Sequence, residues 1–75
     1  MSLTVNGAIA RQDIGPGVWS LVTPEGTTYE LKDAPPDLKQ AGLQVQVEGN
    51  LREDIMTMAA IGPVLEVISF QASDG

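Results

Sequence analysis

The chain has 75 residues, of which 43% are hydrophobic, and ten acidic residues against four basic ones give it a formal net charge of −6. It contains no cysteine and no histidine, which excludes disulfide bonds, thiol nucleophiles and imidazole bases. This length predicts one domain over residues 1–75, stabilised by packing alone.

The acidic balance and the lack of long apolar stretches narrow the range of partners. A net negative charge opposes binding to polyanions, so nucleic acid and anionic lipid are poor partners. No stretch approaches the roughly 18 consecutive apolar residues of a membrane-spanning helix. The first seven residues also lack the basic start and apolar run of a secretion signal. We therefore expect a cytoplasmic protein with no membrane association.

Short strands are predicted from the beginning of the chain. Alternation over residues 3–10 places four residues on one face: Leu3, Val5, Gly7 and Ile9. Residues 18–23 and 28–32 alternate around a glycine-containing turn, which is typical of a hairpin. In the favoured register, the inward residues are Trp19, Leu21, Tyr29 and Leu31. The hairpin residues expected to face water are Ser20, Thr28, Glu30 and Lys32.

The middle of the chain predicts an irregular link followed by a long strand. Residues 35–42 hold two prolines and end on Gly42, a pattern that favours one turn of helix. Leu38 in this link is expected to plug one end of a barrel. Residues 43–51 then alternate strictly, and the predicted inward side chains are Leu43, Val45, Val47, Gly49 and Leu51.

The last third of the chain is apolar on both faces. Residues 55–61 and 64–70 are separated by Gly62 and Pro63. They are either two strands or one strand with a sharp bend, because proline cannot donate a hydrogen bond to a central ladder. The polar tail over residues 71–75 is expected to fray.

Four segments carry a resemblance to a known fold family. They are Val5-Asn6-Gly7, Trp19-Ser20-Leu21, Gly26-Thr27-Thr28-Tyr29-Glu30-Leu31 and Gly42-Leu43-Gln44-Val45-Gln46-Val47-Glu48-Gly49. Together they resemble small uncharacterised bacterial domains of the OB-like type, the oligonucleotide/oligosaccharide-binding fold. The resemblance covers nearly the whole chain. It implies an all-β barrel of five or six strands with at most one short helical turn between the third and fourth strands.

The sequence contains no pattern that predicts catalysis. Asp33 with Asp37, and Glu53 with Asp54, are paired carboxylates, but both pairs lie in predicted turns and lack the spaced oxygen ligands of a calcium loop. The glycine-proline turns lack the lysine and the following helix of a phosphate-binding loop. We therefore expect a noncatalytic protein that uses no metal and no cofactor.

Two binding hypotheses follow. The favoured one is a module that binds another protein, or a second copy of this chain, through an apolar surface. Its candidate residues are Val18, Val22, Ile55, Met56, Met58 and Ile61.

The alternative is implied by the resemblance: single-stranded nucleic acid or oligosaccharide bound across the second and third strands. Its candidate residues are Arg11, Ser20, Thr28 and Lys32. The chain departs here from OB proteins that bind nucleic acid, because such sites need a basic groove and exposed stacking aromatics. The three aromatic residues, Trp19, Tyr29 and Phe70, are expected mainly in the core.

Overall fold

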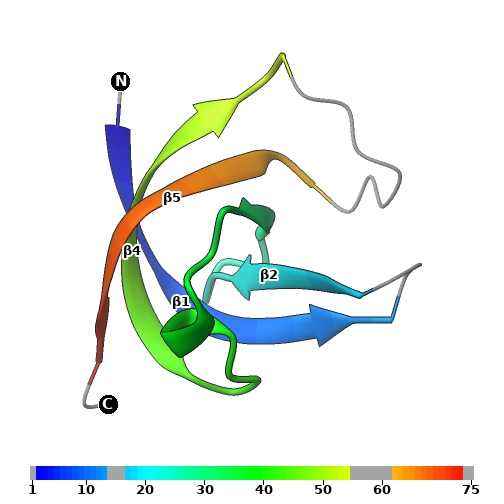
Figure 1. Ribbon diagram of the computed structural model, residues 1–75, viewed down its shortest axis with the longest axis vertical. Helices are drawn as coiled ribbons and strands as arrows, with labels where there is room; N and C mark the ends of the chain where they lie inside the picture. Colours follow the sequence, from blue (N-terminus) through cyan, green and yellow to red (C-terminus); the bar gives the residue numbers. More distant parts are fainter. Residues whose placement is uncertain (1, 14–16, 55–61, 74–75) are drawn as a thin grey trace.

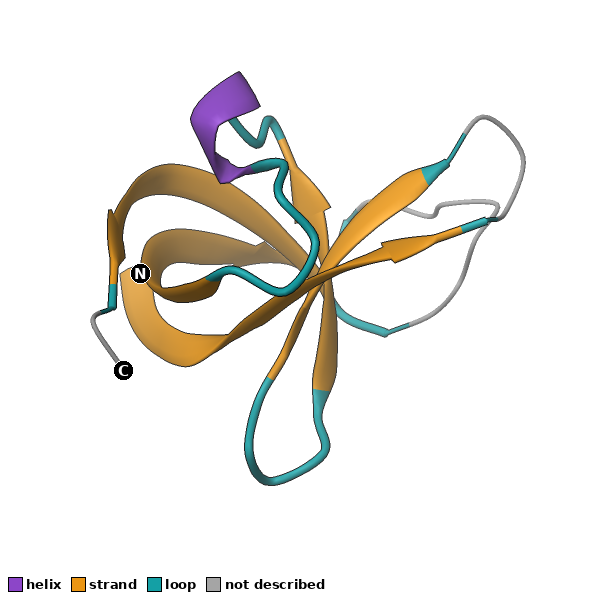
Figure 2. Ribbon diagram, turned by 90° about the horizontal axis from the view of Figure 1, so that it is seen from below, coloured by secondary structure: helices purple, strands orange, loops and turns teal. Residues whose placement is uncertain are grey.

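A computed structural model describes residues 2–13, 17–54 and 62–73 of the chain, and its five strands form one closed sheet (Figure 1). The strands are β1 (Ser2–Gln12), β2 (Val18–Val22), β3 (Thr28–Lys32), β4 (Gln44–Arg52) and β5 (Val64–Ala72). A 3-10 turn, η1 (Pro36–Leu38), lies between β3 and β4 and stands out from the strands in Figure 2. The predicted all-β barrel with one short helical turn is confirmed. None of the described segments forms a helix with the length and apolar character needed to cross a membrane.

The strands follow the order β1-β2-β3-β5-β4 around the barrel. β3 and β5 are parallel, and the other four neighbouring pairs are antiparallel. The predicted hairpin is confirmed as β2 and β3, in which Leu21 pairs with Tyr29.

β1 pairs with two different strands along its length. Its first part, from Ser2 to Ala8, pairs with β4, and its second part, from Ala8 to Gln12, pairs with β2. Figure 1 shows the blue strand crossing from the β4 side of the barrel to the β2 side. Gly7 lies just before this change of partner, and a Cβ atom added there would collide with the main-chain carbonyl oxygen of Val22. The close approach of β1 and β2 therefore requires glycine at this position.

The interior confirms most of the predicted alternation. The buried core cluster is Val5, Ile9, Leu21, Leu38, Val45, Val47 and Leu65. Trp19 and Tyr29 are half-buried and pack against this cluster, as the favoured hairpin register predicts. Leu38 is fully buried, which confirms that the link between β3 and β4 contributes a side chain to the core.

A β-bulge changes which residues of β5 face the core along the strand. The β4–β5 register shifts by one residue between Glu48 and Gly49, so Ile68 has no opposite residue on β4. The extra residue switches the alternation: Leu65 and Val67 pack against the core before the bulge, and Phe70 does so after it. Ile68 is 56% exposed. Residues 64–72 form one strand, and residues 55–61 lie outside the described part of the chain.

Two residues expected to face water are buried. Ser20 and Glu30 lie on the outer face of the hairpin, as predicted, but Ser20 is fully buried and Glu30 is 8% exposed. The two residues are cross-strand partners. Ser20 also pairs with Ala10 on β1, and Glu30 also pairs with Val64 on β5. The Ser20 hydroxyl donates a hydrogen bond to the carbonyl oxygen of Ala10 (3.2 Å), so its burial leaves no unsatisfied hydroxyl. The expectation is wrong because alternation identifies the face of a strand but not whether solvent reaches it.

Two expectations at strand ends are also wrong. Leu51 is 40% exposed, although it shares its parity with the buried Val45 and Val47, because it lies one residue before the end of β4. The tail begins later than predicted, since Gln71 and Ala72 belong to β5. The N–H of Ser73 still donates to the carbonyl oxygen of Gln44 (2.8 Å), which continues the ladder past the strand.

Replacing Gly7 with alanine tests the close approach of β1 to β2. We expect Gly7→Ala to lower the free energy of unfolding by about 1–3 kcal/mol, because the new methyl group forces the two backbones apart. Urea denaturation followed by Trp19 fluorescence measures this change. Gln46→Ala, at an exposed position on β4, is the control and should change it by less than about 0.5 kcal/mol. Equal stability of Gly7→Ala and the control would contradict the described approach.

Candidate functional site

The structure does not gather the predicted apolar candidates into a patch among the described residues. Val18 and Val22 lie at the two ends of β2, both half-buried, with the buried Ser20 between them. The other four candidates lie outside the described residues: Ile55, Met56, Met58 and Ile61.

The four candidates for the second and third strands offer little to a ligand. Ser20 is fully buried and Thr28 is half-buried. Arg11 and Lys32 form ion pairs with neighbouring carboxylates, at 3.0 Å to Asp13 and 3.3 Å to Asp33. Because these cations already face an acid, they contribute little positive potential to a ligand.

A third basic residue is paired in the same way. Arg52 at the end of β4 contacts Asp54 at 2.9 Å and Glu66 at 3.1 Å. The hydrogen bond that the Arg52 guanidinium donates to Asp54 holds the pKa of the Asp54 carboxyl below its usual range. Three of the four basic side chains of the chain are therefore committed to local carboxylates, and the described residues form no basic groove.

A different feature appears along the first half of β1. Ile9 donates its N–H to the carbonyl oxygen of Leu43 (2.8 Å) and accepts from the N–H of Gly42 (2.7 Å), so its main-chain groups point toward the β4 side. Successive residues of a strand point these groups to opposite sides. Val5 and Gly7 therefore bond toward β4, and Thr4 and Asn6 direct their N–H and C=O groups away from it.

No strand of the described part of the chain covers those groups. β2 ends at Val22, which pairs with Ala8, so the position that would continue the ladder opposite Asn6 is Pro24. Proline has no N–H to donate, and the chain turns away at this point. Among the described residues no backbone hydrogen bond connects Thr4 or Asn6 to the β2–β3 turn. We call the main-chain N–H and C=O groups of Thr4 and Asn6 the open edge of β1.

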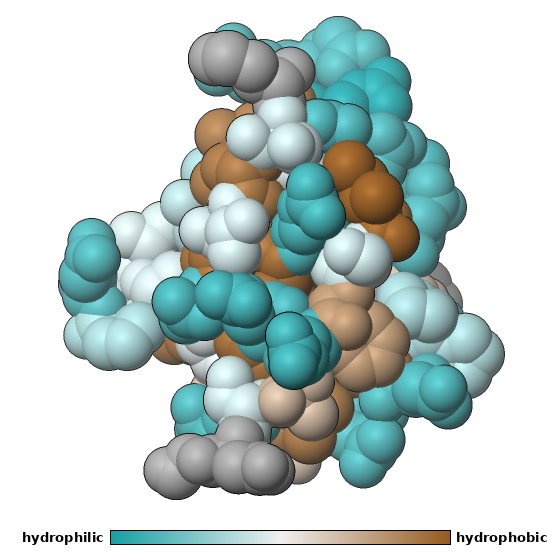
Figure 3. All heavy atoms as spheres, turned by 90° about the vertical axis from the view of Figure 1, so that its left-hand side faces the viewer, coloured by the Kyte–Doolittle hydropathy of each residue, from teal (hydrophilic) through white to brown (hydrophobic). Residues whose placement is uncertain are grey.

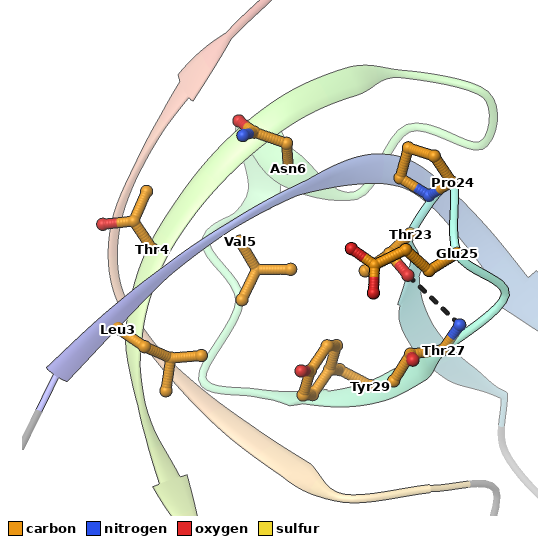
Figure 4. A pocket seen from close by; sticks show the side chains of 9 residues that line it. All are labelled: Leu3, Thr4, Val5, Asn6, Thr23, Pro24, Glu25, Thr27 and Tyr29. Atoms are coloured by element: carbon orange, nitrogen blue, oxygen red, sulfur yellow. Dashed lines mark hydrogen bonds between the residues drawn. The ribbon is translucent and has the colours of Figure 1, made fainter.

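A depression of about 360 Å³ lies beside the open edge (Figure 4). The edge pocket, as we call it, is lined by Leu3, Thr4, Val5, Asn6, Thr23, Pro24, Glu25, Thr27 and Tyr29. Figure 4 shows the side chains of Leu3, Val5 and Tyr29 directed to the inner side of β1 and those of Thr4 and Asn6 directed away from it. The carboxylate of Glu25 points into the pocket from the turn. The pocket thus combines an apolar floor, an acid and an uncovered strand edge.

The turn that carries Glu25 is held by three hydrogen bonds. The N–H of Thr23 donates to the carbonyl oxygen of Thr27 (2.9 Å). The N–H of Gly26 donates to the carbonyl oxygen of Thr23 (3.0 Å). The N–H of Thr27 donates to the hydroxyl oxygen of Thr23 (3.1 Å), the contact drawn in Figure 4. Gly26 has φ +94°, which favours glycine. Glu25 is therefore presented on a defined turn, although its side chain is exposed.

The outer face of β1, β4 and β5 is a mixed surface. Figure 3 looks at the side of the molecule on which β4 and β5 lie and shows brown apolar atoms separated by teal hydrophilic ones. The exposed Glu48 accepts long hydrogen bonds from the hydroxyls of Ser2 (3.4 Å) and Ser69 (3.3 Å). These side chains satisfy one another, and among the described residues the exposed large apolar side chains are limited to Ile68 and Leu51.

Comparison with known proteins finds no matching family model, no matching curated protein and no matching solved structure. Function is therefore inferred from the geometry and chemistry of the chain itself.

The sequence predicts the strands around the edge pocket but does not single out Thr4, Asn6 or Glu25. One signal was available, because Pro24 directly follows the second strand and the first strand is the longer of the two. That signal indicates where β2 must stop. It does not show that the first half of β1 pairs with β4 on one side and, within the described ranges, with no strand on the other.

The pairing of the cations predicts weak affinity for nucleic acid. We expect no measurable binding of a fluorescein-labelled oligothymidylate at low salt, where electrostatic attraction is strongest. Fluorescence anisotropy measures it, with a basic single-strand-binding protein as positive control. Salt-dependent binding by this chain would contradict the absence of a basic groove and would restore the second and third strands as a ligand face.

Proposed function

We propose that this chain is a noncatalytic protein-binding module in which an extended segment of a partner adds to the open edge of β1. The observation that carries the proposal is that the outward main-chain N–H and C=O groups of Thr4 and Asn6, beside the edge pocket, pair with no strand among the residues that the structure describes. Strand addition to an exposed sheet edge supplies affinity through main-chain hydrogen bonds and specificity through pockets for alternate side chains.

The residues around the open edge of β1 suit the binding of a partner segment. Thr4 and Asn6 are exposed residues, and the edge pocket lies directly beside them. The half-buried Tyr29 lines the edge pocket and forms no side-chain hydrogen bond with any residue that the structure describes. A tyrosine in this position suits an interface, where one part of the side chain is buried and the other donates or accepts a hydrogen bond.

We further propose that the barrel is OB-like. The strand order β1-β2-β3-β5-β4, the parallel β3–β5 pair and the position of η1 between β3 and β4 support this. Binding at β1 differs from the use of the second and third strands that the fold implies for nucleic acid or oligosaccharide, and no observation on the described residues favours that alternative. Self-association is the less favoured form of protein binding, because each copy carries a formal charge of −6.

Substitution of Thr4 tests whether its main-chain N–H binds partners. A random heptapeptide phage library selected on the wild-type protein supplies the ligands. We expect the selected phage to lose binding to Thr4→Pro, which removes the outward N–H, and to keep binding to Thr4→Val, which retains it. Proline is tolerated here because the β1–β4 ladder does not use this N–H. Retained phage binding to Thr4→Pro would contradict the proposal.

A second proline variant shows whether a loss of binding comes from the edge or from a folding defect. Asn6→Pro removes the other outward N–H and should cause the same loss, with Asn6→Ser as its matched control. Far-ultraviolet circular dichroism and thermal unfolding show whether each proline variant keeps the barrel. A selection that yields no phage dependent on Thr4 or Asn6 would also overturn strand addition at β1.

A further inference from the structure

We propose that the segment bound at the open edge of β1 is basic, with a lysine or arginine directed at Glu25 and an apolar residue two positions away. This inference rests on the proposed function and specifies its partner. It follows from the register that an added strand must adopt beside β1 and from the side chains that already line the edge pocket.

The register follows from the position that β2 leaves vacant. An added strand occupies the line that β2 would follow past Val22, opposite Asn6, Val5, Thr4 and Leu3 in turn. Directly opposed residues on neighbouring strands place their side chains on the same face. The partner residues opposite Val5 and Leu3 therefore point into the edge pocket, and those opposite Asn6 and Thr4 point outward.

The two inward positions have different surroundings. The carboxylate of Glu25 enters the pocket near Val5, at the end closest to the turn (Figure 4). Leu3 lies farther along β1, and the ring of Tyr29 stands on the opposite side of the pocket. A cationic side chain fits the first position, and an apolar one fits the second, where it covers half-buried carbon surface.

The charge of the edge pocket also favours a basic partner. The lining of the edge pocket contains one acid and no basic residue. Glu25 forms no ion pair with any described residue, whereas Arg11, Lys32 and Arg52 are paired elsewhere. A partner with a cation at this position meets an uncompensated carboxylate in a protein of net charge −6, while an acidic segment is repelled.

Defined peptides test the inference. The probes are two capped heptapeptides, Thr-Thr-Lys-Thr-Val-Thr-Thr and Thr-Thr-Val-Thr-Lys-Thr-Thr, which cover both strand directions, and the same peptides with glutamine in place of lysine. Binding is followed by the amide shifts of Thr4 and Asn6 in titrations at low salt. We expect one lysine peptide to bind about threefold more tightly than its glutamine counterpart, the size of effect that an exposed ion pair supports.

Two variants that each remove one negative charge test whether Glu25 causes the preference for lysine peptides. Glu25→Gln should abolish the preference for lysine over glutamine. Glu48→Gln removes one carboxylate from the outer face of β4, outside the edge pocket, and should leave the preference in place. Glu25 lies in an exposed turn, so its substitution is not expected to affect folding.

The outcomes separate this inference from the proposed function. Equal affinity for lysine and glutamine peptides, or a preference that survives in Glu25→Gln, would overturn the basic partner and leave strand addition standing. Failure of both lysine peptides to bind would also overturn the basic partner. Phage selection with the Thr4 variants then decides separately whether the edge binds any peptide.

Discussion

β1 serves two neighbours, with its first part against β4 and its second part against β2. This division allows the five described strands to close into one sheet around the buried core cluster. It also means that each part of β1 has one side whose hydrogen bonds must be satisfied elsewhere. Leu43 and Gly42 cover that side at Ile9, but Pro24 ends the ladder before Asn6 and Thr4 are reached. The open edge is thus a consequence of how the barrel closes.

The periodicity of the chain predicts the fold well because burial acts directly on it. Leu3, Val5 and Ile9 contact the interior as alternation requires, and the same holds for Val45 and Val47. The bulge at Ile68 breaks the two-residue alternation, and the adjacent apolar residues Val67 and Ile68 do not show by themselves which of them faces the core. Ser20 illustrates a second limit: it lies on the outward side of its strand as predicted, but alternation does not reveal that it is fully buried.

The candidate site is harder to predict than the core because it depends on hydrogen bonds that are not formed. In the sequence, Thr4 and Asn6 look like ordinary outward residues of a first strand. Only the strand pairing shows that β4 lies on one side of them and that β2 ends before it reaches them on the other. Glu25 looks like a turn residue until the fold brings it beside Val5 and Tyr29. The apolar candidates selected from the sequence are instead half-buried or outside the described residues.

Residue-resolved amide hydrogen exchange by NMR tests this account most directly. The N–H groups of Val5 and Gly7 should exchange slowly because they belong to the β1–β4 ladder, and those of Thr4 and Asn6 should exchange rapidly because they face away from it. Equal protection of all four amides in the isolated protein would contradict the account, since it would mean that the far side of β1 is already covered.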